Sequence, residues 1–267
     1  MTAPKLGIVA GGGALPGLLV GACRDQGRDC FLLALKGFAE PEKLGREPDA
    51  WLRLGDAGSG FALMRGAGVA EIVMAGTVKR PKLSDLRPDL KTAAFFARMA
   101  GRLLGDDGLL RALIDEIERE GFTVVGAHDV LASLLAPAGV FGVIAPDAAA
   151  ERDIAVGKSA AHDHGRADLG QAVIVHDGEV IGREKVEGTA ALIAEAGKPG
   201  AILVKMQKPQ QDRRADLPTI GPDTVTQAAA AGLRGIAVQA GGCLVIDLPD
   251  VRARADAAGI FVVGVTP

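Results

Sequence analysis

Short apolar runs alternate with amphipathic segments through the first half of the chain. Residues 6–10, 30–35 and 71–76 have the length and apolar content of buried strands. Between the first two runs, LPGLLVGACRDQG has helical spacing and stops near Gly27, and DDGLLRALIDEIEREG predicts an amphipathic helix with acidic residues in its first turn. Apolar strands that alternate with helices indicate a parallel sheet covered on both faces.

The second half of the chain follows a different pattern. Two apolar runs flank Asp177 and Gly178 in QAVIVHDGEVIG, which predicts a β-hairpin. A helix from about Thr189 and the strand AILVKM come next, followed by a helix from about Asp223, the strands GIAVQ and CLVIDL, a helix from about Val251 and the strand FVVGV. This order predicts a mixed α/β domain.

Residues 131–152 separate the two patterns. Proline and glycine punctuate this stretch and no clear period runs through it, as is typical of a linker. We therefore expect a parallel-sheet domain over residues 1–132, a linker over 133–150 and a second α/β domain over 151–267. A length of 267 residues is ample for two domains of ordinary size.

Composition narrows the range of functions. The net charge of −3 and the aromatic content of 3 % argue against a nucleic-acid binder, which needs basic surface or stacking platforms. Three scattered cysteines do not form a disulfide framework or a CxxC site. The N-terminus lacks the pattern of a signal peptide, and no apolar run approaches the ~18 residues of a membrane span. We expect a cytoplasmic protein.

A glycine-rich loop, VAGGGALPG, lies between the first predicted strand and helix. The backbone N–H groups of Gly11, Gly12 and Gly13 and the positive end of the helix suit a phosphate. Pro16 stands where a dinucleotide fingerprint has its third glycine, and no acidic residue ends the second strand, so NAD does not fit. A nucleotide contact and a tight turn without a ligand both remain open.

Polar residues also follow the other predicted strands of the first half. Thr77, Lys79 and Arg80 come directly after one core strand, and His128 comes at the end of another. Because ligands of open parallel sheets bind outside the carboxyl ends of the strands, these side chains could meet a diphosphate. A solvated loop is the alternative reading.

The most informative stretch is KPQQDRRADLPTIGP, residues 208–222, which directly follows the strand AILVKM. Charged and amide side chains crowd together from the end of that strand onward: Lys205, Lys208, Gln211, Asp212, Arg213, Arg214 and Asp216. Three prolines stiffen the segment, and a stiff loop holds catalytic groups in fixed geometry. Phosphoryl chemistry needs oxygen ligands for a hard metal ion and cations that offset phosphate charge. A salt-bridged surface loop is the alternative.

At these residues the chain resembles one family. GIVAGGGALP, AGTVKRP, GDDGLLR, GFTVVGAHD, DLGQAVIV, EGT, LVKMQKPQQDRRADLPTIGP and AGIFVVG occur in this order. Together they are similar to the LpxI-type UDP-2,3-diacylglucosamine pyrophosphatases of lipid A biosynthesis. The likeness spans essentially the whole chain, and the charged segment is far more specific than any glycine loop.

The resemblance implies a fold and a reaction. The fold would be a Rossmann-like N-terminal domain and a separate C-terminal α/β domain, with the ligand between them. The reaction would be metal-dependent hydrolysis of UDP-2,3-diacylglucosamine to UMP and 2,3-diacylglucosamine 1-phosphate (lipid X). An acylated substrate implies an acyl-binding surface in the C-terminal domain and transient contact with the inner face of the inner membrane. A homodimer is left open.

Chemistry and placement suggest roles for individual residues. Asp216 and Asp212 would bind Mg²⁺ or Mn²⁺ or orient water, and Lys205 and Lys208 would neutralise phosphate charge. Gln211 would orient the sugar phosphate.

The remaining candidates are contacts to the substrate. The glycine loop and Thr77 would hold the nucleotide, and further substrate contacts would come from Lys79, Arg80, His128, Gln171, Glu187 and Thr189. Ala190 stands where many relatives are expected to have an acidic residue after EGT, so a catalytic role for that position is open.

Two other functions compete with this interpretation. A nucleotide-sugar oxidoreductase or transferase would use the first domain as a cofactor site, and NAD(P) bound after purification would support it. A non-catalytic sensor would bind a UDP-sugar without turnover, but it gives no reason for the carboxylate-rich segment.

Overall fold

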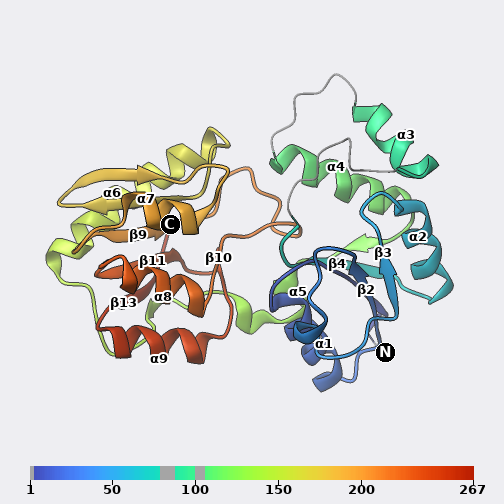
Figure 1. Ribbon diagram of the computed structural model, residues 1–267, viewed down its shortest axis with the longest axis horizontal. Helices are drawn as coiled ribbons and strands as arrows, with labels where there is room; N and C mark the ends of the chain where they lie inside the picture. The colour runs from blue at the N-terminus through green and yellow to red at the C-terminus, as the bar shows by residue number, and fades with distance from the viewer. Residues whose placement is uncertain (1–2, 79–87, 100–105) are drawn as a thin grey trace. The chain divides into compact units, whose positions relative to one another are not determined.

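The computed structural model describes residues 3–78, 88–99 and 106–267, which form two compact units (Figure 1). Unit 1 contains the chain up to Ala132 together with Asp212–Ala215. Unit 2 contains Ser133–Gln211 and Asp216–Pro267. The charged segment is therefore shared, since four of its residues belong to unit 1 and the others to unit 2.

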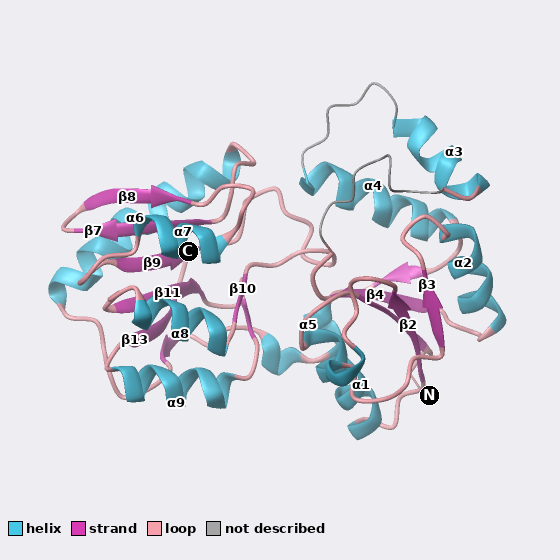
Figure 2. Cartoon of the chain, viewed as in Figure 1, coloured by secondary structure: helices cyan, strands magenta, loops and turns pink. Residues whose placement is uncertain are grey.

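Unit 1 is built on a five-stranded sheet in the order β3-β2-β1-β4-β5 (Figure 2). Its strands are β1 Leu6–Ala10, β2 Cys30–Leu35, β3 Ala50–Leu52, β4 Glu71–Ala75 and β5 Thr123–Val124. All neighbouring strands are parallel. The strand order reverses at β1, as in doubly wound folds, and this confirms the parallel sheet that the apolar runs predict.

Helices cover the sheet of unit 1. They are α1 Leu15–Asp25, α2 Ala57–Gly66, α3 Leu90–Met99, α4 Asp106–Arg119 and α5 Ala127–Val130, with a 3₁₀ turn, η1, at Pro41–Lys43. Phe61 and Met64 of α2 and Ile114 and Ile117 of α4 enter one core cluster, which confirms the apolar stripe predicted for α4.

Unit 2 has a six-stranded mixed sheet in the order β6-β13-β11-β9-β7-β8. Its strands are β6 Gly139–Val140, β7 Ala172–His176, β8 Glu179–Arg183, β9 Ile202–Lys205, β11 Gly235–Gln239 and β13 Phe261–Val265. β9, β11 and β13 are parallel, whereas the predicted β7–β8 hairpin is antiparallel. Asp177 and Gly178 at its turn both have positive φ, as a two-residue hairpin turn requires.

The helices of unit 2 lie on both faces of this sheet. They are α6 Ala148–Arg166, α7 Thr189–Ala196, α8 Pro222–Ala230 and α9 Leu248–Ala258, and a 3₁₀ turn, η3, spans Ala132–Leu134. On β9, Ile202 and Val204 pack in one core cluster with α6, whereas Leu203 packs in the opposite cluster with α7. Because side chains alternate along a strand, Lys205 projects on the α7 face.

Two segments differ from what their sequence suggests. Residues 133–150, expected to form a linker, contain β6, which pairs with β13, and the first turn of α6. Asp147 caps that helix by accepting a hydrogen bond from the Ala150 N–H at 2.8 Å. The run CLVIDL forms only the short strand β12, Leu244–Val245, which pairs in a separate small sheet with β10, Thr219–Ile220.

No helix within residues 3–78, 88–99 and 106–267 combines the length and the apolar character that crossing a membrane requires.

The glycine-rich turn after β1 lies against the end of β4. Gly12 and Thr77 exchange two backbone hydrogen bonds of 2.9 Å. A Cβ atom on Gly11 would lie 2.8 Å from the carbonyl oxygen of Thr77, and a Cβ on Gly76, whose φ is +91°, would overlap the carbonyl oxygen of Gly12. Glycine is therefore required at positions 11 and 76 because two backbone segments approach each other closely.

The Gly76→Ala variant should lower the free energy of unfolding of unit 1 by about 1–3 kcal/mol, since it combines positive φ with a backbone overlap. Urea denaturation measures the change. Gly21→Ala is the matched control: Gly21 lies in α1 with no atom within 4 Å of an added Cβ, so alanine should be neutral or stabilise by up to about 1 kcal/mol. Equal stability of the two variants would contradict this explanation of the turn.

Candidate active site

Three polar side chains of the charged segment and its strand are buried in unit 2. Lys205 ends β9 and is 5 % exposed, while Lys208 and Gln211 follow it at 8 % and 7 %. A buried ammonium group is costly unless hydrogen bonds and opposite charge compensate it. The partners of these side chains therefore define the chemistry of the site.

Lys205 is held by a short relay of polar groups. Its Nζ donates a hydrogen bond of 2.7 Å to the hydroxyl of Thr189, the first residue of α7. That hydroxyl donates in turn to Oε1 of Glu184 at 2.5 Å, and the Lys205 Nζ lies 4.0 Å from the same oxygen. The carboxylate of Glu184 is itself buried, so opposite charge compensates the ammonium group inside the unit.

Lys208 and Gln211 extend the arrangement towards Asp216. The Lys208 Nζ contacts Oδ1 of Asp168 at 2.8 Å, just beyond the end of α6. The Gln211 side-chain amide donates to Oδ2 of Asp216 at 2.5 Å and to Oε1 of Gln171 at 3.2 Å. We call the connected set the lysine network; its members are Asp168, Gln171, Glu184, Thr189, Lys205, Lys208, Gln211 and Asp216.

Asp216 is the carboxyl group of the network with a perturbed pKa. Burial raises its pKa above the usual range, whereas the Gln211 hydrogen bond and the charges of Lys208 and Lys205 act in the opposite direction. A carboxyl group with a shifted pKa beside two ammonium groups at a strand end is a candidate for function. Cys243 is fully buried near Lys205, and burial raises the pKa of its thiol to about 12, which keeps it a neutral core residue.

Asp212 belongs to unit 1 and is paired with an arginine. Its two oxygens accept hydrogen bonds of 3.0 and 2.8 Å from the Arg214 guanidinium, which also contacts Glu118 of α4 at 2.8 Å. The Arg214 hydrogen bond holds the pKa of Asp212 below its usual range. A metal-binding role for Asp212 stays a prediction, and its present contacts are those of a structural ion pair.

The glycine turn and Thr77, predicted to hold a nucleotide, come together at the switch point of the unit 1 sheet. The N–H of Gly13 donates to Oε1 of Glu40 at 2.9 Å, and Lys43 contacts the other oxygen of Glu40. A carboxylate of the chain thus occupies one of the backbone donors that a phosphate would use. Lys79 and Arg80 lie outside the described residues.

The other predicted contacts are more dispersed. The His128 side chain lies in α5 and is 14 % exposed, with no hydrogen-bond partner for its buried Nδ1 among the described residues. Glu187 is exposed between β8 and α7, as is Ala190 in the first turn of α7. Neither belongs to the lysine network, whereas Gln171 and Thr189 do.

Comparison with known proteins decides the family. A model described as the LpxI N-terminal domain matches residues 5–134, and one described as the LpxI C-terminal domain matches residues 137–263. The chain belongs to the LpxI family. It is 40 % identical over 275 residues to the UDP-2,3-diacylglucosamine pyrophosphatase LpxI of Caulobacter vibrioides, with 98 % of each chain covered. The resemblance drawn from the motifs is confirmed, and the lysine network is part of the LpxI C-terminal match.

Two members of the network escaped prediction from the sequence. Glu184 follows the last residue of β8, and Asp168 adopts a positive φ of 55° just after α6. A carboxylate at a strand end is a usable signal for Glu184, because the residues of the charged segment were selected by the same criterion. The contact of Asp168 with Lys208 depends on how the chain leaves α6, and the sequence gives no sign of it.

The carboxylates of the site could bind a metal ion only if substrate and water supply most of its ligands. Among the described residues, no group of three or more His, Cys, Asp or Glu side chains could hold an ion. Mg²⁺, however, is commonly bound by one or two carboxylates together with substrate phosphates and water. Asp216 fits such a single-carboxylate site, whereas both oxygens of Glu184 already accept hydrogen bonds, from Thr189 and the Gln171 N–H.

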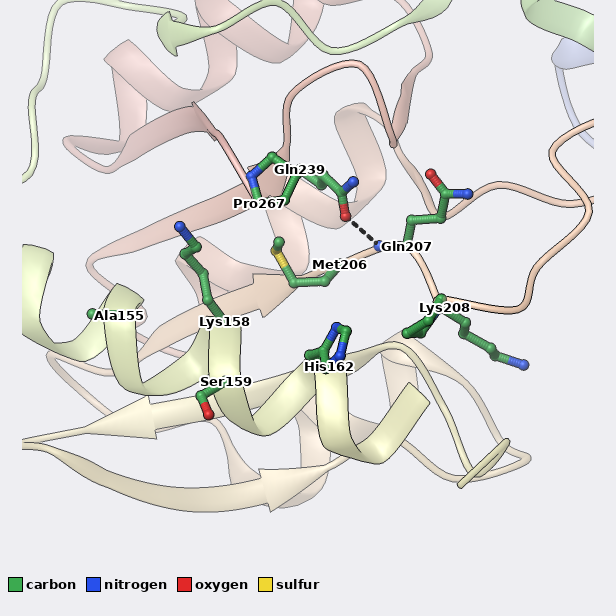
Figure 3. A pocket seen from close by; sticks show the side chains of 10 residues that line it. Ala155, Lys158, Ser159, His162, Met206, Gln207, Lys208, Gln239 and Pro267 are labelled. Carbon is green, nitrogen blue, oxygen red and sulfur yellow. Dashed lines mark hydrogen bonds between the residues drawn. The ribbon is translucent and has the colours of Figure 1, made fainter. Parts of the chain in front are cut away.

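A cavity of about 550 Å³ opens on the α6 side of unit 2 (Figure 3). It is lined by Ala155, Lys158, Ser159, His162, Met206, Gln207, Lys208, Pro209, Gln239 and Pro267. The backbone of Lys208 borders the cavity while its ammonium group points away from it (Figure 3). The cavity therefore adjoins the charged segment but lies on the opposite face of β9 from Lys205.

The contacts of Asp212 lead to a prediction about stability. Asp212→Asn should lower the free energy of unfolding by about 0.5–1 kcal/mol at pH 7, because the paired carboxylate has a lowered pKa. The difference should shrink as the pH falls below the usual range of aspartate and through that lowered pKa, where the wild-type carboxylate also becomes neutral.

Urea unfolding of both proteins at pH 7 and pH 3 measures this change. Asp25→Asn is the control, since the Asp25–Arg24 pair is 74 % and 78 % exposed and should contribute almost nothing. A deficit in Asp212→Asn that is the same at both pH values would contradict the ion-pair explanation.

Proposed function

We propose that this chain hydrolyses the diphosphate of UDP-2,3-diacylglucosamine to UMP and 2,3-diacylglucosamine 1-phosphate (lipid X). Membership of the LpxI family and the 40 % identity to a pyrophosphatase of that name support the substrate. The structural observation that carries the proposal is the lysine network, in which Lys205 and Lys208 are buried and Gln211 hydrogen-bonds the carboxyl group of Asp216. Two buried cations beside a carboxyl group suit a reaction at a diphosphate.

The lysines would act on the charge of the phosphates. Hydrolysis brings a water oxygen towards a phosphorus atom surrounded by negative oxygens, so positive groups fixed in advance lower the barrier. Lys205 and Lys208 are already desolvated and held by Thr189 and Asp168. Their orientation therefore need not be established at the moment of reaction.

Asp216 would act on the water molecule that attacks the phosphorus atom. Its carboxylate can orient the water or hold a divalent ion, and Gln211 fixes one of its oxygens. A hard ion such as Mg²⁺ or Mn²⁺ would add positive charge at the phosphate oxygens. Asp216 is the described residue that fits as its protein ligand, with substrate oxygens and water completing the shell.

The acyl chains of the substrate call for an apolar surface. Withdrawing them from a bilayer costs about 0.8 kcal/mol per CH₂ group unless the protein supplies equivalent contacts. Ala155, Met206 and Pro209 line the cavity beside Lys208 and offer such contacts in unit 2. We therefore place part of the acyl-binding surface there, with transient docking of the protein at the membrane.

The reaction is tested by incubating the purified protein with UDP-2,3-diacylglucosamine and Mg²⁺ and measuring UMP. Wild type should release UMP, and Asp216→Asn should lower kcat by about 10² or more with little change in substrate binding, because the carboxylate acts in the transition state. Asp177→Asn, at the exposed hairpin turn, is the isosteric control and should keep full activity. No UMP from wild type would refute the function, and normal turnover by a folded Asp216→Asn would refute the role.

The need for a metal ion is tested by chelation. Excess EDTA should abolish UMP release, and Mg²⁺ or Mn²⁺ in molar excess over the chelator should restore it, since carboxylate and amide oxygens favour hard ions. A melting curve with and without EDTA checks that the protein stays folded. Unchanged activity in EDTA would refute the need for a metal ion.

A further inference from the structure

Glu184 is the most enclosed carboxylate of the lysine network. Its residue is 6 % exposed, and it immediately follows β8 in the chain. One carboxylate oxygen, Oε1, accepts the hydrogen bond of the Thr189 hydroxyl at 2.5 Å. The other, Oε2, accepts that of the Gln171 backbone N–H at 2.9 Å. Both oxygens are thus engaged, so the carboxylate has one fixed orientation.

The two oxygens lead to two different groups of the proposed site. From Oε1 the hydrogen bonds pass through Thr189 to the ammonium of Lys205. From Oε2 they pass to Gln171, whose side-chain oxygen accepts a bond from Gln211.

Gln211 completes the second branch, because its side-chain amide also donates to Asp216. The cation and the carboxyl group assigned to the reaction are therefore joined through a single buried side chain.

We infer that Glu184 is a positioning residue for the proposed hydrolysis: it holds Lys205 through Thr189, while its second oxygen is fixed by the Gln171 N–H. This inference rests on the proposed function, because it assigns Glu184 to the same reaction. Glu184 itself contacts neither phosphate nor water in this role. It fixes where the ammonium lies and supplies the negative charge that compensates the buried cation.

The direction of the hydrogen bonds requires a carboxylate at position 184. The Lys205 ammonium can only donate, so Thr189 must accept from it and donate its own proton to Glu184. The Gln171 N–H also needs an acceptor. Glutamine at position 184 offers one oxygen and one NH₂ group, so it cannot satisfy both donors and lacks the negative charge.

The test is a double-mutant cycle with Glu184→Gln and Lys205→Met, assayed by UMP release from UDP-2,3-diacylglucosamine. In the wild-type background, Glu184→Gln should lower kcat at least about tenfold and change KM less than about threefold. In the Lys205→Met background, the same substitution should cost less than about threefold, because its target is already absent. Glu179→Gln, on exposed β8 surface, is the matched control and should have wild-type kinetics.

The possible outcomes separate the inference from the proposed function. If wild type releases no UMP, the function fails and the inference with it. If wild type is active, the inference is overturned by normal kcat in Glu184→Gln or by an equal loss in both backgrounds, which would indicate a merely structural role.

Circular dichroism and melting curves check the fold of each variant. Should Glu184→Gln not fold, Thr189→Val cuts the same relay while leaving carboxylate and ammonium in place. It should show the same loss of kcat and the same dependence on Lys205, and full activity of this variant would overturn the inference.

Discussion

The candidate site in unit 2 is organised around two ammonium groups that are buried at and just beyond the end of β9. A buried cation is tolerated only where acceptors and opposite charge surround it, and three elements near the end of β9 supply them. The end of β8 supplies Glu184, the start of α7 supplies Thr189 and the end of α6 supplies Asp168. Such an arrangement is poorly suited to stability alone, since apolar residues of similar volume would fill the space at lower cost. Its presence is best explained by a negatively charged ligand.

Much of the fold follows from local patterns in the sequence. Residues 6–10 and 202–204 are apolar on both strand faces because helices cover both sides of each sheet, and the Asp177-Gly178 turn encodes its hairpin directly. Strand β6 could not be found in this way. It has two exposed residues, and its pairing with β13, more than a hundred residues later in the chain, determines that it is a strand. The alanine-rich start of α6 likewise has no apolar period, and its cap at Asp147 is the only local signal.

The sequence predicts those residues of the candidate site that lie together in one segment. It does not predict the residues that separate segments contribute. Lys205, Lys208, Gln211 and Asp216 come from one strand end and its following loop, and the structure connects them. Asp212 is the same residue type in the same loop, but it belongs to unit 1. There it pairs with Arg214, which also contacts Glu118. Residue type and spacing do not distinguish these two carboxylates. Their partners do: Asp212 pairs with Arg214, which in turn contacts Glu118, 96 positions away, whereas Asp216 accepts a hydrogen bond from Gln211, five residues away.

The two segments that first suggested phosphate chemistry have different physical explanations. In the glycine turn, Gly11 and Gly76 are required by the close approach of their own backbones, and Glu40 satisfies the Gly13 N–H. These glycines would be needed even in a protein without a nucleotide. The charged segment has no comparable internal reason, since burying Lys205 and Lys208 adds a cost that folding does not require. Buried charges that folding does not require are better evidence for function than glycines that the backbone itself requires. This comparison favours the lysine network over the glycine turn as the place of the reaction.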